Sequence, residues 1–279
     1  MGTAAEMTIW EHIDELRSRV VRIVICITVI TLFVSTFGLK PFDYNGLHLA
    51  YPFPDPINNI STKVALHMKN SLLPPDVHFI QTAPGQAFFA TIYVSILIGI
   101  LGSLPVIAKE ISGFISPAIS GNTKKTFLKL LLPSIFLFVA GVAFSYAFVI
   151  PFTIKFLYQY GSALGAEKFF NVNDFVSFVM QFFIGFGLAF QLPIIMYAIS
   201  LTGIISPRFW RSNFRYAVII LAIFGAAITP DGSGVTMWFV AGPMIALYLV
   251  GMVAVERKAK REMERESENG ESDRAELSI

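Results

Sequence analysis

The stretch IWEHIDELRSRVVR at residues 9–22 runs without a break into the apolar stretch IVICITVITLFVSTFG at residues 23–38, and this junction organises the chain. On a helix, apolar residues recur at three- and four-residue steps along one face: Ile9, Ile13, Leu16 and Val20. Polar residues recur in the same way on another face: His12, Glu15, Arg19 and Arg22. The sequence therefore predicts an amphipathic helix that lies at a membrane surface before it crosses. Taken alone, this helix is either a positive-inside anchor with i,i+4 charge pairs or a docking surface for a charged ligand.

The composition is that of a membrane protein. Hydrophobic residues make up 54% of the 279 residues and charged residues only 14%, whereas soluble domains carry about 25% charged residues. The net charge of +2 gives no indication of a nucleic-acid partner. Cys26 is the single cysteine, so we expect no internal disulfide and no cysteine-based metal site. We also expect no cofactor.

Six apolar stretches are candidates for membrane spans, because a bilayer core of about 30 Å needs about 20 apolar residues per helix. The predicted spans are 20–38, 86–107, 126–150, 174–200, 214–229 and 235–255. Prolines in or beside the spans indicate kinks, so we expect an all-α fold with six transmembrane helices in a kinked, concave bundle. The fifth span is short, so it either forms a tight hairpin with the sixth or lies where the membrane thins.

Lysine and arginine are unevenly divided between the connecting segments. Of the 21 in the chain, 16 fall on one side of the predicted spans, and five fall on the other: Lys40, Lys63, Lys69, Lys155 and Lys168. The positive-inside rule then predicts that both termini face the cytoplasm of a plasma-membrane protein. The predicted parts are a cytoplasmic amphipathic segment at 1–19, a transmembrane domain at 20–255 and a charged cytoplasmic tail at 256–279. The tail has no apolar periodicity after Met263, which is typical of a helix that frays into disorder.

The longest connection, residues 39–85, is expected outside the cell as a loop with rigid proline turns. Between its prolines, four apolar residues at helical spacing predict a short amphipathic helix that caps the outer face: Ile57, Ile60, Val64 and Met68. The triplet Asn59-Ile60-Ser61 matches a glycosylation sequon, which we interpret as incidental.

Motifs for hydrolysis or phosphate binding are missing from the sequence. It contains neither a phosphate-binding Gly-x-x-x-x-Gly-Lys-Ser/Thr loop nor a His-Glu-x-x-His zinc motif, so we expect no enzyme. A secondary solute transporter is the alternative membrane function. However, such a carrier usually needs titrating groups within the membrane, and the fourth span offers only Gln181 and Gln191. Gln191 precedes Pro193, so it either bonds across helices or satisfies a carbonyl that the proline leaves free.

Five blocks in order resemble the TatC family of the twin-arginine protein translocase, and together they span roughly residues 9–250. The blocks are HIDELRSR at 12–19; LPVI at 104–107 with FISPA at 114–118; GVAFSY at 141–146 with Pro151; SFV at 177–179 with FGLAFQLP at 186–193; and GIISP at 203–207 with TPD at 229–231. The resemblance implies a receptor that binds the paired arginines of signal peptides on folded cargo at the cytoplasmic face. It also implies assembly with single-helix subunits of the TatA and TatB type, several copies of the chain in one complex, contact with membrane lipid, and transport driven by the proton gradient.

The resemblance also assigns site residues. Glu15 matches the family's N-terminal recognition glutamate, which suits a guanidinium because carboxylates bind it with bidentate, charge-assisted hydrogen bonds. The other predicted signal-peptide residues are His12, Arg17, Arg19, Glu110, Phe114, Pro117, Lys124 and Lys125. The predicted intramembrane polar contacts to a partner are Gln191 and Asp231.

Two positions depart from the family pattern. Many members carry a second glutamate before a basic pair in the first cytoplasmic loop, where this chain has Thr123. We predict that Glu110 supplies that second carboxylate, and Asp14 is the other candidate. The family often has a glutamate where this chain has Gln191, which can hydrogen-bond but cannot titrate.

Overall fold

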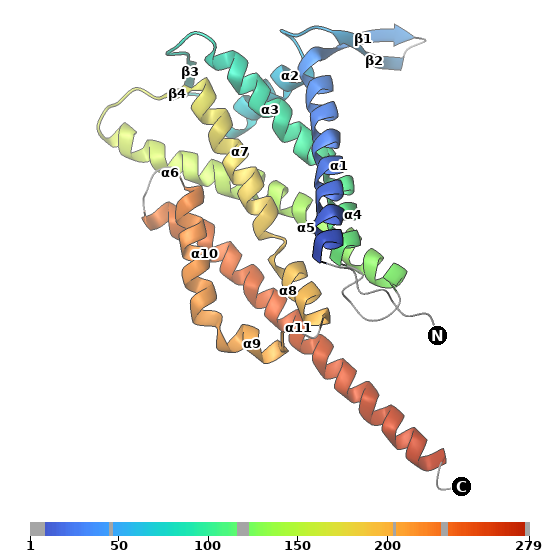
Figure 1. Cartoon of the computed structure of the whole chain (residues 1–279). Coiled ribbons are helices and arrows are strands. Elements are labelled where there is room, and N and C mark those ends of the chain that lie inside the picture. The colour runs from blue at the N-terminus through green and yellow to red at the C-terminus, as the bar shows by residue number, and fades with distance from the viewer. Residues whose placement is uncertain (1–8, 45–46, 116–122, 203–204, 230–233, 277–279) are drawn as a thin grey trace. The chain divides into compact units, whose positions relative to one another are not determined.

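The computed structural model describes residues 9–44, 47–115, 123–202, 205–229 and 234–276, and it is predominantly helical (Figure 1). The helices are α1 (Ile9–Thr36), α2 (Ile60–Leu72), α3 (Gln86–Gly102), α4 (Leu104–Ile115), α5 (Thr123–Phe144), the π turn η2 (Ser145–Val149), α6 (Ile150–Ala163), α7 (Val172–Ala189), α8 (Leu192–Leu201), α9 (Pro207–Ser212), α10 (Phe214–Ile228) and α11 (Gly234–Glu276). The strands are β1 (Phe37–Tyr44), β2 (Leu47–Pro54), β3 (His78–Ile80) and β4 (Phe169–Asn171). The fold is thus the predicted all-α membrane architecture, with two small sheets that the sequence did not indicate.

Four helical stretches among the described residues are long and apolar enough to cross a membrane: Trp10–Thr36, Leu130–Ala163, Val172–Leu201 and Gly234–Arg261. A fifth is the pair α3 and α4, if the bent pair counts as one span. Helix α10 has 15 residues and is therefore about 22 Å long. Every predicted span thus contains a helix, and α10 is as short as predicted, while the count of six spans stays a prediction.

Prolines mark most of the breaks in the long helices. Helices α3 and α4 meet at an angle of 51°, just before Pro105. The π turn η2 precedes Pro151 at the start of α6, and the break between α7 and α8 precedes Pro193. At Pro133 and Pro243, by contrast, α5 and α11 continue through the proline. A kink is therefore confirmed beside Pro105, whereas Pro151 and Pro193 follow irregular turns within stretches that each count as one continuous span.

The segment predicted as an external loop contains a β-hairpin that its sequence did not indicate. Strands β1 and β2 pair antiparallel from Phe37 opposite Pro54 to Tyr44 opposite Leu47. The prolines of this segment argued for turns, but both strands of a two-stranded ribbon are edges, and edge strands tolerate proline. Pro41, for example, lies opposite Ala50 within the ladder.

The helix predicted in the same loop is confirmed as α2, but it begins at Ile60, so Ile57 lies outside it and is exposed. Asn59 caps the helix, because its side-chain oxygen accepts a hydrogen bond from the backbone N–H of Thr62. The Asn59 amide also donates to the carbonyl oxygens of Ser35 and Pro56, and the residue is only 2% exposed. The sequon asparagine therefore has a structural role as a buried cap.

The chain divides into two compact units, and the first comprises Met1–Ser116 with Val142–Ile184. Within it α1 packs on α3, and α2 packs on both. The hydroxyl oxygens of Ser61 on α2 and Ser95 on α3 lie 2.6 Å apart in the buried contact between these helices. A Cβ at Gly99 would lie 2.9 Å from the carbonyl oxygen of Ile27, so α1 and α3 approach closely at this glycine.

The first unit also contains the parallel pair β3–β4, with His78 opposite Phe169. Beside it, the Lys168 ammonium donates a hydrogen bond to Asp76, and this bond lowers the pKa of the Asp76 carboxyl below its ordinary 3.8. The contact joins the segment that follows α2 to the segment that precedes α7.

The second unit comprises Pro117–Gly141 with Gly185–Ile279, and in it α11 packs on α8, α9 and α10. Met196 and Met244 are fully buried in this unit. Helices α5 and α7 meet at Gly141, where a Cβ would lie 2.5 Å from the carbonyl oxygen of Phe186. Helix α11 continues to Glu276, so the prediction that the tail frays into disorder is wrong for the described residues. The tail keeps its helix because its charged residues favour helix even without an apolar face.

Candidate functional site

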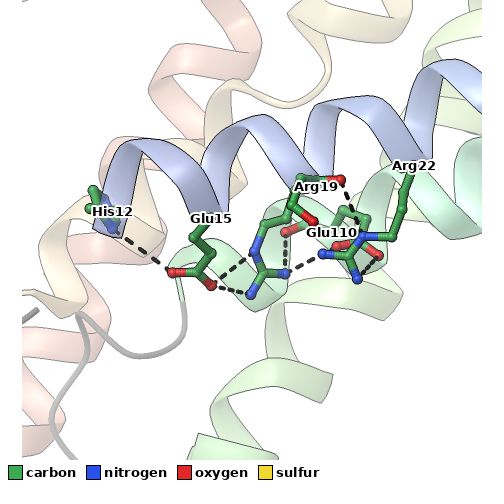
Figure 2. A network of polar contacts seen from close by, with 6 residues as sticks. His12, Glu15, Arg19, Arg22 and Glu110 are labelled. Atoms are coloured by element: carbon green, nitrogen blue, oxygen red, sulfur yellow. Dashed lines mark hydrogen bonds and ion pairs between the residues drawn. The ribbon is translucent and has the colours of Figure 1, made fainter. Parts of the chain in front are cut away.

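The predicted polar face of α1 forms a chain of ion pairs, and Arg19 lies at its centre. The carboxylate oxygen Oε1 of Glu15 accepts hydrogen bonds from Arg19 Nε at 3.0 Å and from Arg19 Nη2 (Figure 2). His12 Nδ1 lies 4.0 Å from the other Glu15 oxygen, Oε2. The i,i+3 and i,i+4 spacing on one helix places these three side chains together.

The second carboxylate comes from α4, which packs on α1. Glu110 Oε2 accepts a hydrogen bond from Arg19 Nη1 at 3.1 Å, and the Glu110 carbonyl oxygen accepts one from the same nitrogen at 3.2 Å. Arg22 Nη1 lies 3.4 Å from Glu110 Oε1. The Glu110 side chain is 5% exposed, that of Glu15 26% and that of Arg19 19%. Arg19 therefore bridges two carboxylates from different helices, as Figure 2 shows.

Two neighbours on α4 shape the site. A Cβ at Gly113 would lie 2.7 Å from Arg19 Nη1, so the absence of a side chain there makes room for the guanidinium. The rings of His12 and Phe114 stack with centroids 4.5 Å apart and planes 22° apart. This stack holds the first turns of α1 against the end of α4.

The structure separates the predicted residues into two groups. It brings together His12, Glu15, Arg19, Glu110 and Phe114. Arg17 is exposed and lies two residues from both Glu15 and Arg19, so it points to another side of α1. Asp14, the other candidate for the second carboxylate, is likewise exposed.

Four further predictions fall in or near segments that the structure leaves undescribed. Lys124 and Lys125 belong to the first turn of α5, and their side chains are not described. Pro117 and Asp231 lie outside the described residues.

Gln191 lies in the second unit and joins two helices. Its side-chain nitrogen Nε2 donates a hydrogen bond to the Ser134 carbonyl oxygen of α5 at 3.1 Å and lies 3.5 Å from the Gly187 carbonyl oxygen. Of the two alternatives for Gln191, the bond across helices is therefore confirmed. A carbonyl freed by Pro193 would be that of Ala189, four residues earlier, which is not the partner found.

Two members of the α1–α4 site were not among the predicted residues. Arg22 recurs on the predicted polar face, so its spacing from Glu15 and Arg19 was the available signal. Gly113 gave no signal, because the need for a glycine follows only from where α4 meets Arg19.

Comparison with known sequences identifies the family. The family model described as Sec-independent protein translocase protein (TatC) matches residues 11–243. The chain belongs to the TatC family. A TatC from Cenarchaeum symbiosum (strain A) is 47% identical over 258 residues, which cover 92% of this chain and 98% of the relative. A TatC from Aquifex aeolicus (strain VF5) is 31% identical over 257 residues, which cover 90% of this chain and 98% of the relative.

A solved TatC structure agrees with this assignment. The crystal structure described as Twin Arginine Translocase Receptor- TatC superposes with a TM-score of 0.73 at 29% identity, covering 88% of this chain and 98% of that chain. This TatC chain is therefore a membrane subunit of the Sec-independent protein translocase and takes part in protein transport. These matches give no support to the alternative of a secondary solute transporter.

Proposed function

We propose that Glu15 and Glu110 bind the paired arginines of twin-arginine signal peptides at the cytoplasmic face, which makes this chain the receptor subunit of its translocase. The observation that carries the proposal is that this pair of carboxylates already binds a guanidinium, that of Arg19, in the structure. A site that holds one guanidinium between two carboxylates has the chemistry needed for another. The solved relative is itself described as a twin-arginine translocase receptor.

Thr123 has no carboxylate, so in this proposal Glu110 supplies the second carboxylate of the site. Its carboxylate lies on the same arginine as Glu15, whereas Asp14 is exposed. In this proposal Phe114 and Pro117 form the other wall of the site. His12, Arg17, Arg19, Lys124 and Lys125 set the orientation and charge around it.

The remaining parts of the assembly follow the same proposal. Six spans with both termini in the cytoplasm place α1 and α4 on the side from which cargo arrives, which the distribution of lysine and arginine supports. Single-helix subunits of the TatA and TatB type, further copies of the chain and membrane lipid complete the complex, and the proton gradient drives transport. Gln191 and Asp231 are the proposed polar contacts to a partner helix, and since glutamine cannot titrate, no protonation switch is assigned to it.

Binding of a fluorescent signal peptide to the protein in nanodiscs tests the receptor role, with an Arg-Arg peptide compared with its Lys-Lys counterpart. We expect Glu15→Gln and Glu110→Gln each to weaken Arg-Arg binding by about 10- to 100-fold, because each loses a charge-assisted contact worth about 1.5–3 kcal/mol. Asp14→Asn and the exposed control Glu167→Gln should leave the affinity unchanged. If the Lys-Lys peptide binds as tightly as the Arg-Arg peptide, the receptor proposal is wrong.

A second outcome separates the two carboxylates. If Glu110→Gln leaves binding intact while Glu15→Gln abolishes it, the role of Glu110 is refuted and that of Glu15 stands. A photoreactive phenylalanine analogue at position 114 should crosslink to the Arg-Arg peptide. The same analogue at Phe148, which is exposed on η2, serves as the control.

A further inference from the structure

We propose that Arg19 is an internal ligand of the signal-peptide site, which a peptide arginine must displace in order to bind, so that Arg19 sets the affinity of the receptor. This inference rests on the function proposed above and concerns how the same site is occupied when no cargo is present.

The contacts of Arg19 are those expected of a bound guanidinium. Three of its nitrogens donate to acceptors on two helices: Nε and Nη2 to the Glu15 carboxylate, and Nη1 to both the carboxylate and the carbonyl oxygen of Glu110. The Glu110 side chain is 5% exposed, that of Arg19 19% and that of Glu15 26%, so most of this contact is shielded from solvent. Gly113 leaves room for the guanidinium. An incoming arginine would need the same acceptors in the same place.

The charges in the site favour exchange over addition. Glu15 and Glu110 carry two negative charges, and Arg19 and Arg22 carry two positive charges against them. Two peptide arginines added to this arrangement would place four cations around two carboxylates, at separations where like charges repel strongly. Departure of Arg19 leaves three cations instead of four, which weakens that repulsion, and it exposes the acceptors together.

Displacement has a measurable consequence for affinity. When only a fraction of the receptor has Arg19 out of the site, the apparent dissociation constant is the intrinsic constant divided by that fraction. The penalty is the same for every peptide that uses the site, so it weakens Arg-Arg and Lys-Lys peptides by the same factor. It also gives a route to release, because Arg19 is tethered beside the site and returns when the peptide leaves.

Peptide binding to the Arg19→Gln variant in nanodiscs tests this inference. Glutamine is uncharged, so it cannot replace the Arg19 guanidinium between the two carboxylates. We expect tenfold or greater tightening for the Arg-Arg peptide, with an unchanged ratio of Arg-Arg to Lys-Lys affinity. Arg19→Lys keeps the charge, but its single ammonium cannot span both carboxylates, so a smaller gain is expected. Arg22 is 53% exposed and lies 3.4 Å from the Glu110 carboxylate, so Arg22→Gln should give a still smaller gain. Arg208→Gln, an exposed arginine on α9, is the neutral control.

A second measurement does not depend on how a variant folds. In the wild-type protein, phenylglyoxal modification of each arginine is followed by mass spectrometry with and without the Arg-Arg peptide. Displacement predicts that Arg19 becomes more reactive when the peptide binds, while Arg208 does not change.

Weaker binding by both Arg19 variants, or lower reactivity of Arg19 in the complex, overturns the inference and makes Arg19 a fixed wall of the site. The proposed function survives that result. A wild-type protein that binds no Arg-Arg peptide at all would instead overturn the proposed function itself.

Discussion

The tie between α1 and α4 should be measurable as a coupling energy between Arg19 and Glu110. A double-mutant cycle with Arg19→Gln and Glu110→Gln isolates this pair from the rest of the network. The Glu110 side chain is 5% exposed and that of Arg19 is 19% exposed, and the pair includes a 3.1 Å hydrogen bond between charged groups. Hydrogen bonds to charged groups contribute about 1.5–3 kcal/mol, so we expect a coupling near the middle of that range, about 2 kcal/mol.

A second double-mutant cycle, with Arg22→Gln and Glu110→Gln, gives a coupling energy with which the first can be compared. Arg22 reaches the same carboxylate but is 53% exposed and lies 3.4 Å from it. An exposed ion pair contributes about 0.2–1 kcal/mol, so this coupling should be about half of the first or less. The two cycles share Glu110→Gln, so any general effect of losing that carboxylate cancels in the comparison.

The free energy of unfolding of each variant, measured by denaturant titration in mixed micelles, gives both couplings. If the Arg22 coupling equals or exceeds that of Arg19, the bridge seen between the two carboxylates does not hold the helices together. A coupling for Arg19 and Glu110 below about 0.5 kcal/mol would contradict the reasoning in the same way, because it would place the pair in the range of exposed ion pairs.

Three further predictions concern stability elsewhere in the chain. Gly141→Ala should lower the unfolding free energy by about 1–3 kcal/mol, because its Cβ would lie 2.5 Å from the Phe186 carbonyl oxygen. A Cβ at Gly242 would meet nothing within 4 Å, so the control Gly242→Ala should instead raise the unfolding free energy by about 0.5–1 kcal/mol through helix propensity. Equal effects in the two variants would refute the packing argument. Asn59→Ala should cost about 1–2 kcal/mol in the same titration through loss of the α2 cap, and a neutral result would remove the role assigned to this buried asparagine. Asp76→Asn should lower the melting temperature at pH 7. Because the folded pKa of Asp76 lies below 3.8, the difference in melting temperature from wild type should persist above pH 3.8 and vanish as the pH falls through the folded pKa. A difference that stays constant in strong acid would contradict the ion pair.

Apolar length predicted the helices well, and it could do so because backbone polar groups in a bilayer must be satisfied within the helix. Apolar length could not predict where the helices end. Helix α11 runs past the apolar stretch to Glu276 because charged residues also favour helix. The β1–β2 hairpin was missed because its prolines argue against a strand, and only the fact that both strands are edges makes them acceptable.

The site could be predicted in part because its α1 members follow a helical repeat. Glu15 and Arg19 are four residues apart, so the sequence places them together. Glu110 is 91 residues from Arg19, and without the family resemblance no spacing rule would have joined them. That Arg19 would lie between the two carboxylates could not be predicted, because it depends on the approach of α4 at Gly113.

The 51° bend between α3 and α4 makes α4 a lever arm. Glu110 lies seven residues beyond the pivot at Ser103, which is about 10 Å along the helix. A change of about 10° in the bend would swing Glu110 through about 2 Å, which is enough to break its 3.1 Å hydrogen bond with Arg19. We expect the tilt of α3 and the contact between Glu110 and Arg19 to be coupled through this lever, so that lipids of different thickness change the strength of that contact.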